Sequence, residues 1–337
     1  MKSNLKRKIG HLDDMVDPVG IGAMSFSDFY GACDDDMADA VLSRALELGL
    51  NHIDTSNVYG NGISEQRIGA FLNKQGKQKQ GLFHIATKAG IARKPGTMER
   101  IFNNDAEYLE QQLDMSLSRL GLDHVDLFYV HRRQAEIPIE EVTGSLARLV
   151  EKGKVRTIGY SEIAPSSLRR ASAIHPVAAV QSEYSLSTRA PEMGLVQTCA
   201  ELGTTLVAFS PVGRTLLTDR PKTFEQVQEI GFLKGNPRFM QPNYDMNISY
   251  IRRFQAYAAD MGVATASLAI AWVLAQGEQV IAIPGTRKAE HLDELAAARD
   301  IEITDQIKAE IEQLLPVGWA YGDRYSDDQW VGPERYS

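Results

Sequence analysis

The stretch "VDLFYVHRRQAEIPIEEVTGSLARLVEKGKVRTIGYS", residues 125–161, contains the repeating unit of this chain. Apolar runs rich in β-branched residues, at 125–131 and 155–161, flank a longer segment with helical periodicity that ends near a glycine. Such runs favour buried strands, and the segment between them favours a helix. A strand, a helix and a second strand in this order predict two parallel strands joined by a crossover helix.

The same alternation continues along the whole chain. Six more strand-like runs are found, at residues 19–24, 51–55, 83–88, 178–182, 204–210 and 280–285. Eight strand–helix units in a chain of 337 residues fit a (β/α)8 TIM barrel better than a doubly wound sheet. No linker of unusual composition divides the chain, so residues 1–337 are predicted to form a single domain. Residues 5–18 are expected to form a hairpin over the bottom of the barrel.

Composition narrows the functional classes. The chain is 43% hydrophobic and 24% charged with a formal net charge of −8, which is ordinary for a globular protein and argues against a nucleic-acid surface. Only Cys33 and Cys199 occur, so neither a disulfide framework nor a metal site is expected. No stretch approaches the ~20 apolar residues of a membrane span. We therefore expect a cytoplasmic protein without a membrane partner.

Ionisable residues stand at the ends of three consecutive predicted strands. Asp54, Lys88 and His131 end the strands at 51–55, 83–88 and 125–131, and Tyr59 follows the first of them closely. In a barrel the carboxyl ends of the strands converge on one face, where active sites are built. Each residue alone is commonly structural, as a buried ion pair, a surface lysine or a core histidine. Together at one rim they predict a catalytic site.

These four residue types suit the reduction of a carbonyl group. A tyrosine has a pKa of ~10 in water, and a neighbouring ammonium such as that of Lys88 lowers this pKa and eases proton donation. Asp54 would balance the charge of Lys88, and His131 would orient the carbonyl oxygen. Since no side chain supplies hydride, a bound cofactor is required.

Several motifs resemble the aldo-keto reductase superfamily, in order and spacing, from about residue 18 to residue 315. They are "LNHIDTSNVYGNGISEQRIG", "ATKAG", "YVHR", "VEKGKVRTIGYSE", "VQSEYS", "AFSPVGR" and "IPGTRKAEHLDEL". More narrowly, "AMSFSDFYG", "QSEYSLSTRAPE" and "GNPRFMQPNYDMNI" resemble the bacterial and yeast branch related to pyridoxal reductase. The resemblance implies a barrel that binds NADP(H) across its carboxyl-end face without a Rossmann domain. Consistently, "GIGAMS" is only a partial dinucleotide-binding fingerprint.

The resemblance also implies roles for individual residues. The catalytic set is Asp54, Tyr59, Lys88 and His131, with Tyr59 as the general acid. Ser161 and Gln181 would bind the carboxamide of the nicotinamide, and Phe209 would stack on its ring. The full cofactor-binding set comprises Met24, Asp54, Ser161, Gln181, Phe209, Ser210, Pro211, Val212, Gly213, Arg214, Gly285, Thr286, Arg287, His291, Glu294 and Leu295.

Two turns are expected to hold the phosphates. The turns 210–214 and 285–288 follow the seventh and eighth strands, where barrels often bind phosphate. Arg214 would meet the pyrophosphate and Arg287 the 2′-phosphate, which favours NADPH over NADH. His291 stands where many similar proteins place a further arginine, so the preference is expected to be weaker than is usual in the family.

Two other positions depart from the family pattern. Glu162 replaces an asparagine that usually follows the strand-five serine, so it offers no amide donor to the carboxamide. Leu295 replaces an asparagine near the adenine and would give only an apolar contact, although Glu294 is retained. We therefore assign Ser161 alone, of the pair 161–162, to the carboxamide.

The sequence allows more than one interpretation for each of two long segments. Residues 215–247 would either fold over the cofactor when it binds, as we expect, or pack permanently on the barrel rim. The aromatic tail from Pro316 would cover a substrate pocket, or serve as a surface strap or subunit contact.

The predicted partner is a small carbonyl compound, with aldehydes, ketones, pyridoxal and sugars all open. The alternative function is an NADP-binding regulatory module with little turnover.

A barrel hydrolase or isomerase is less consistent with the sequence. Such an enzyme would require a metal cluster or paired carboxylates at the strand ends, and the sequence places neither there. His84 and His124 lie at strand starts, on the opposite rim, and are predicted to be structural.

Overall fold

A parallel eight-stranded barrel forms the centre of the molecule, in a computed structural model that describes residues 6–94, 96–97 and 99–337. Each strand of the barrel pairs with the next one along the chain. The strands are β3 (Ile21–Gly22), β4 (His52–Asp54), β5 (His84–Ala89), β8 (Val125–Val130), β9 (Val155–Ser161), β10 (Val177–Glu183), β11 (Thr205–Phe209) and β12 (Val280–Ile283). All eight lie at or within one or two residues of the predicted runs, which confirms the (β/α)8 fold.

The barrel is closed between its first and last strands. Val19 forms a parallel bridge with Ala282. The backbone N–H of Gly20 donates to the carbonyl of Ala282 at 2.8 Å, and the N–H of Gly22 donates to that of Pro284 at 2.9 Å. Closure leaves no free edge in the central sheet, and it brings the ends of β3 and β12 to the same rim.

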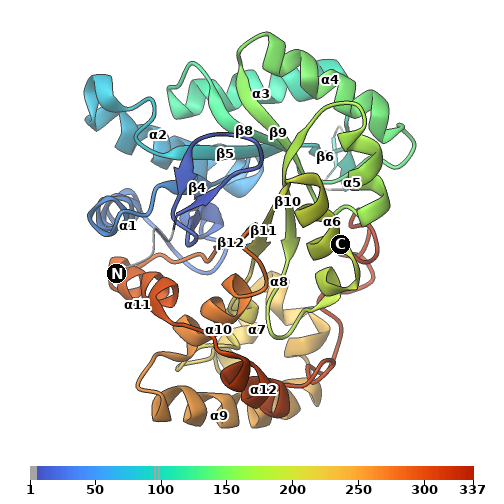
Figure 1. Cartoon of the computed structure of the whole chain (residues 1–337). Coiled ribbons are helices and arrows are strands. Elements are labelled where there is room, and N and C mark those ends of the chain that lie inside the picture. The colour runs from blue at the N-terminus through green and yellow to red at the C-terminus, as the bar shows by residue number, and fades with distance from the viewer. Residues whose placement is uncertain (1–5, 95, 98) are drawn as a thin grey trace.

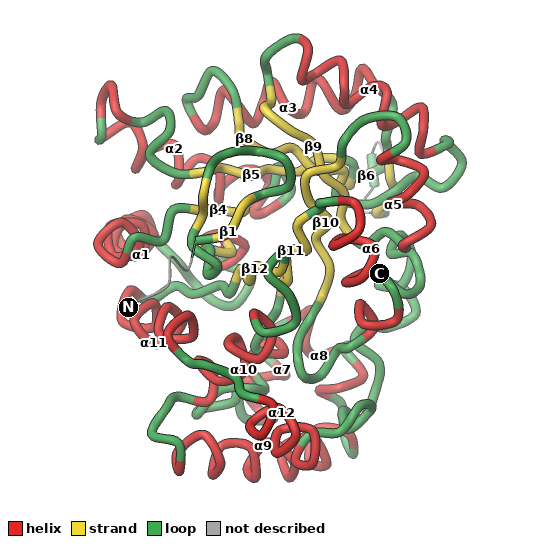
Figure 2. Tube along the Cα trace, in the orientation of Figure 1, coloured by secondary structure: helices red, strands yellow, loops and turns green. Residues whose placement is uncertain are grey.

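Helices form a ring outside the strands, as Figures 1 and 2 show. They are α1 (Asp35–Leu48), α2 (Ile63–Lys74), α3 (Ala106–Leu120), α4 (Ile139–Glu151), α5 (Pro165–Ser172), α6 (Leu195–Leu202), α7 (Phe224–Gln228), α8 (Gly231–Lys234), α9 (Asn243–Asp260), α10 (Thr265–Leu274), α11 (Ala289–Ala297) and α12 (Asp305–Leu314). Short 3₁₀ turns are η1 (Ala23–Ser27), η2 (Tyr59–Gly62), η3 (Gly76–Gln78), η4 (Ala190–Met193), η5 (Gly213–Thr215), η6 (Pro237–Phe239) and η7 (Ala298–Asp300).

Helix α1 illustrates how the sequence sets these elements. The side chain of Asp34 accepts a hydrogen bond from the backbone N–H of Met37 at its start, and Gly49 ends it with a left-handed φ of 76°. Val41, Leu42 and Ala45 form the buried face between these caps. The helix therefore covers the barrel with an apolar face and exposes a polar one.

No single helix within the described residues has the length and apolar composition to cross a membrane. Helices α9 and α10 meet that criterion only when taken together, and they are bent by 91° where they join. Every residue of α10 is buried.

An antiparallel hairpin closes the bottom of the barrel, as predicted. It pairs β1 (Arg7–Lys8) with β2 (Met15–Val16), while residue 5 of the predicted segment lies outside the described residues. Ile9 and Val16 join the apolar cluster inside the barrel. Gly10 has a φ of 55°, and a Cβ there would lie 2.5 Å from the Cα of Ala178, so only glycine fits this close approach.

The opposite end of the barrel, which we call the mouth, is the face where the strands end. Its rim includes a hairpin that the sequence did not suggest, β6 (Ile91–Arg93) paired antiparallel with β7 (Arg100–Phe102). Residues 215–247 contain α7, α8, η6 and the start of α9. They pack on the rim through Phe232, whose ring stacks on that of Phe29 at 4.4 Å.

The tail after α12 has no helix or strand in the described chain, but it is firmly held (red in Figure 1). Trp319 is buried, and its indole N–H donates to the carbonyl of Leu186 at 2.7 Å. Arg324 and Ser337 are buried as well. The tail is thus part of the folded mouth, and the backbone N–H of Glu334 donates to the carbonyl of Glu162 at 2.9 Å.

Candidate active site

The four predicted catalytic residues lie together at the mouth. Asp54 ends β4, Lys88 lies near the end of β5, His131 directly follows β8, and Tyr59 begins η2. The fully buried ammonium of Lys88 donates to the carboxylate of Asp54 and to the Tyr59 hydroxyl, the latter at 3.3 Å. It also donates to the carbonyl of Thr55 at 2.8 Å. A single cation therefore links an acid and a phenol in a site with little water.

His131 is held beside the tyrosine. Its ring lies edge-on to that of Tyr59, with 5.9 Å between ring centres. Its Nδ1 shares a hydrogen bond of 3.1 Å with the hydroxyl of Ser56. Ser56 was missed in the sequence, because a serine two residues after the strand-end aspartate carries no distinctive pattern. Its bond occupies Nδ1 and leaves Nε2 as the ring nitrogen for a substrate.

The electrostatics of this group differ from the expectation in one respect. Burial raises the pKa of Tyr59 above its usual value, and the opposing effect of Lys88 does not cancel that of burial. Although burial disfavours its ammonium, Asp54 and Tyr59 hold the pKa of Lys88 above its usual value. Burial, with the charges of Arg132, Lys88 and Arg100, lowers the pKa of His131 well below its usual value. At neutral pH the site therefore holds a protonated phenol, an ammonium and a neutral imidazole.

Three residues assigned to the nicotinamide surround this group from the next strands. Ser161 and Phe209 end β9 and β11, and Gln181 lies in β10. The amide nitrogen of Gln181 donates to the carboxylate of Asp54 at 2.7 Å, which leaves its amide oxygen for another donor. The Ser161 hydroxyl is buried and the Phe209 ring is partly exposed. A hydroxyl, an amide and an aromatic face at adjacent strand ends fit a nicotinamide and its carboxamide.

Arg132 is a further residue of the mouth that sequence reasoning did not single out. Its guanidinium donates to the Ser161 hydroxyl at 3.1 Å and to the backbone carbonyl of His131 at 2.6 Å. It also reaches the Tyr325 hydroxyl of the tail at 3.4 Å. The signal that could have found Arg132 was its place directly after the strand-end histidine.

Beside the nicotinamide residues lies a buried group that we call the arginine–glutamate cluster. Its members are Glu162, Glu183, Arg214, Arg238 and Arg324. Arg324 holds the carboxylate of Glu162 with two hydrogen bonds, at 2.9 and 2.5 Å. Burial alone would raise the pKa of Glu162, but the charge and hydrogen bonds of Arg324 outweigh burial and lower this pKa to about 2. Glu162, which stands where similar proteins usually have an asparagine, therefore binds the tail through Arg324.

Arg214, assigned to the pyrophosphate, also belongs to this cluster. It donates to the carboxylate of Glu183 at 2.7 Å and lies over the ring of Tyr325, 4.9 Å from its centre. The backbone of the 210–214 turn is tight, with left-handed φ values at Ser210 and Arg214 and a 2.9 Å bond from the N–H of Gly213 to the carbonyl of Ser210. A phosphate at this turn would share Arg214 with Glu183.

The predicted residues of the turn after β12 make two separate sets of contacts. Arg287 is half-buried beside Gly31, and its guanidinium donates to the carbonyl of Ala32 at 2.5 Å. The Thr286 hydroxyl shares a 3.2 Å hydrogen bond with Nδ1 of His291.

The remaining predicted contacts lie around this turn. Burial raises the pKa of Glu294, which is partly buried in α11. Leu295 lies in the apolar core, Gly285 is exposed, Pro211 is buried, and Val212 and Met24 are partly buried.

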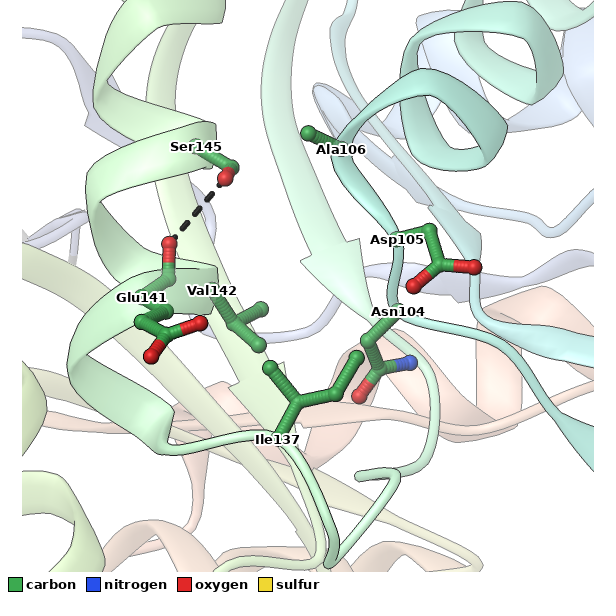
Figure 3. Close-up of a pocket in the computed structure, with 7 residues that line it drawn as sticks. All are labelled: Asn104, Asp105, Ala106, Ile137, Glu141, Val142 and Ser145. Carbon is green, nitrogen blue, oxygen red and sulfur yellow. Dashed lines mark hydrogen bonds between the residues drawn. The ribbon is translucent and has the colours of Figure 1, made fainter.

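A separate groove lies outside the mouth, between the starts of α3 and α4 (Figure 3). It is lined by Asn104, Asp105, Ala106, Ile137, Glu141, Val142 and Ser145. None of the predicted catalytic residues lines it. Across the described residues no group of three or more histidine, cysteine or acidic side chains is arranged to hold a metal ion.

Comparisons with known proteins identify the family and the fold. The model of the Aldo/keto reductase family matches residues 18–316. The aldo-keto reductase yakc from Schizosaccharomyces pombe, named for NADP(+), is 37% identical over 322 residues, which are 95% of this chain and 94% of that protein. Probable aldo-keto reductase 1 from Glycine max is also 37% identical, over 94% of this chain and 91% of that protein.

Solved structures share the fold. The glycerol dehydrogenase AKR11B4 from Gluconobacter oxydans is 25% identical with a TM-score of 0.81, and the match covers 93% of this chain and 95% of that one. The aldo-keto reductase AKR11C1 from Bacillus halodurans, in its holo form, is 24% identical with a TM-score of 0.77, over 96% and 99% of the two chains.

Proposed function

Because this chain belongs to the aldo-keto reductase family, we propose that it reduces an aldehyde or ketone to an alcohol with NADPH, using Tyr59 as the general acid. The observation that carries the proposal is the position of the Lys88 ammonium. It is bound to both the carboxylate of Asp54 and the hydroxyl of Tyr59 at the mouth of the barrel.

The raised pKa of Tyr59 supports its role in reduction. A general acid must keep its proton until negative charge develops on the carbonyl oxygen. Burial keeps the phenol of Tyr59 protonated at rest, and the ammonium of Lys88 stabilises the phenolate that proton donation creates. Asp54 keeps Lys88 charged, and the neutral His131 orients the carbonyl through Nε2.

The cofactor is NADP(H), in keeping with the relative that is 37% identical and named for NADP(+). Ser161 and Gln181 bind the carboxamide, and Phe209 stacks on the nicotinamide ring. The turns at 210–214 and 285–288 bind the phosphates, with Arg287 on the 2′-phosphate. When bound, NADPH supplies the hydride.

The test is a panel of aldehydes and ketones assayed by the loss of NADPH absorbance. Tyr59→Phe should reduce turnover by at least about 100-fold while NADPH affinity, measured by fluorescence, stays within a few-fold. Turnover of Tyr59→Phe near that of the parent would remove Tyr59 from its role. Tight NADPH binding by the parent without turnover of any compound would favour the regulatory module instead.

A further inference from the structure

Arg132 holds a guanidinium beside the catalytic group without a carboxylate partner. Its three hydrogen-bond partners are uncharged oxygens, those of the His131 carbonyl, the Ser161 hydroxyl and the Tyr325 hydroxyl. The side chain is only partly buried, and its bonds to Ser161 and Tyr325 place it at the mouth. None of the carboxylates in the described part of the chain forms an ion pair with Arg132 within 4.0 Å.

The neighbouring arginines differ from Arg132 because they have carboxylate partners. Arg133, the next residue, pairs with Glu334 at 2.5 Å. Arg324 takes the carboxylate of Glu162, which also accepts the backbone N–H of Glu183 and the Ser337 hydroxyl. The carboxylate of Glu162, whose charge also interacts with Arg132, is therefore already held by other donors, and within the described chain it forms no ion pair with Arg132 within 4.0 Å. This leaves room for a direct anionic partner of Arg132.

A second guanidinium adds to the positive charge of the mouth. Arg100, at the start of β7, donates to the backbone carbonyls of Asp328 and Val331 in the tail. Its charge acts on His131 in the same direction as those of Arg132 and Lys88. Two arginines bonded to neutral oxygens, whose charges both act on His131, form a site that attracts an anion.

We propose that the carbonyl substrate carries a carboxylate or phosphate group, bound by Arg132 while its carbonyl oxygen meets Tyr59 and His131. This inference rests on the proposed carbonyl reduction. A planar guanidinium offers two parallel donors to such an oxyanion. The long bond to Tyr325, at 3.4 Å, is the contact that an incoming anion displaces most readily.

The test compares pairs of related substrates in which one member carries an anionic group and the other does not. The pairs are 4-formylbenzoate with its methyl ester, and glyceraldehyde 3-phosphate with glyceraldehyde, each assayed with NADPH. The parent should have a kcat/KM at least roughly 10-fold higher for an anion than for its neutral partner, and Arg132→Gln should reduce this ratio by roughly 10- to 100-fold. The pair with the larger change identifies carboxylate or phosphate as the preferred group.

Arg133→Gln is the matched control, because Arg133 is adjacent but paired with Glu334, and its ratio should equal that of the parent. A parent without preference for either anion, or an unchanged ratio in Arg132→Gln, would overturn the proposal. If the parent reduces other compounds of the panel but none of these four, the inference is overturned. If it reduces no compound at all, the proposed function fails, and calorimetry decides the inference alone. Benzoate and inorganic phosphate, titrated into the NADP(+)-loaded protein, should bind the parent at least roughly 10-fold more tightly than Arg132→Gln, and equal affinities would overturn the inference.

Discussion

At the scale of single residues, Lys88 has two separable roles. It is fully buried, and its ammonium is the cation that compensates the buried carboxylate of Asp54. The same ammonium contacts the hydroxyl of Tyr59. We expect stability to depend on the first contact and proton donation on the second, so mutations can distinguish them.

We therefore predict that Lys88→Met both stops turnover and destabilises the fold by roughly 3–5 kcal/mol, because Asp54 becomes a buried, uncompensated charge. Combining it with Asp54→Asn should restore much of the stability, measured by urea unfolding, but none of the turnover. Full activity in the double variant would show that Lys88 acts only as a structural ion pair.

Arg287 provides a second prediction at this scale. A guanidinium facing a 2′-phosphate contributes on the order of 1.5–3 kcal/mol, which corresponds to a preference for NADPH of roughly ten-fold or more. Arg287→Ala should lose that preference, as measured by the dissociation constants of NADPH and NADH. Lys152→Ala is the control, since Lys152 is exposed, lies outside the phosphate turns and pairs with Glu110 at 2.7 Å. Equal affinities for both nucleotides in the parent would refute the selectivity.

At the scale of elements, the tail is the segment whose position most affects the site. Its contact with Glu162 spans 162 residues of sequence and joins the end of β9 to the last part of the chain. Tyr325 of the tail lies against Arg132, Arg214 and Arg324. The tail therefore forms one wall of the mouth and is expected to influence which substrates enter.

Replacing Glu162 tests this coupling. Glu162→Gln leaves the buried Arg324 with the more distant Glu183, 3.8 Å away, as its remaining carboxylate, which should cost up to roughly 3 kcal/mol and loosen the tail. We expect faster proteolysis of the tail, a changed ranking of carbonyl substrates and nearly unchanged NADPH affinity. Glu140→Gln is the control, because its pair with Arg170 is exposed. A ranking identical to that of the parent, with the tail shown to be loosened, would contradict the role of the tail.

The elements also show what local sequence can and cannot predict. The eight strands were recognisable because each is a short run rich in apolar and β-branched residues, such as 125–131, separated from the next by a longer segment of helical periodicity. The hairpin β6–β7 was not, because Ile91–Arg93 and Arg100–Phe102 are three-residue strands without periodicity. The convergence of the four predicted catalytic residues followed from barrel geometry, whereas the pairing of Glu162 with Arg324 depends on how a tail without regular structure folds back.

At the scale of the whole molecule, two buried histidines at the bottom of the barrel are expected to lower the free energy of unfolding in acid. His52 and His84 lie at the starts of β4 and β5 with 3.3 Å between their Nδ1 atoms. Burial lowers the pKa of each to about 4, and the second histidine adds to the effect on the first. Both are therefore neutral in the folded protein and protonate more readily when it unfolds.

The sign of the pH dependence follows from this difference. Between pH 6.5 and about 4 the unfolded chain binds more protons, so the free energy of unfolding falls as the pH falls. From pH 7 to pH 5 the loss should be about 2 kcal/mol for each histidine. In His84→Gln the decline, measured by urea unfolding at each pH, should be shallower than in the parent. Parallel curves for the two proteins would contradict the assignment.

The bottom hairpin has a further consequence for how the protein is made. Arg7, in β1, donates to the backbone carbonyls of Leu274 and Gly277 at 2.9 Å, and the N–H of Gly10 donates to the Thr205 hydroxyl at 2.8 Å. Residues 7–16 leave the ribosome well before these partners, the last of which lie more than 250 residues later in the chain. Residues 7–16 therefore cannot dock until the last strand has been released from the ribosome. Until then Ile9 and Val16 remain exposed to chaperones.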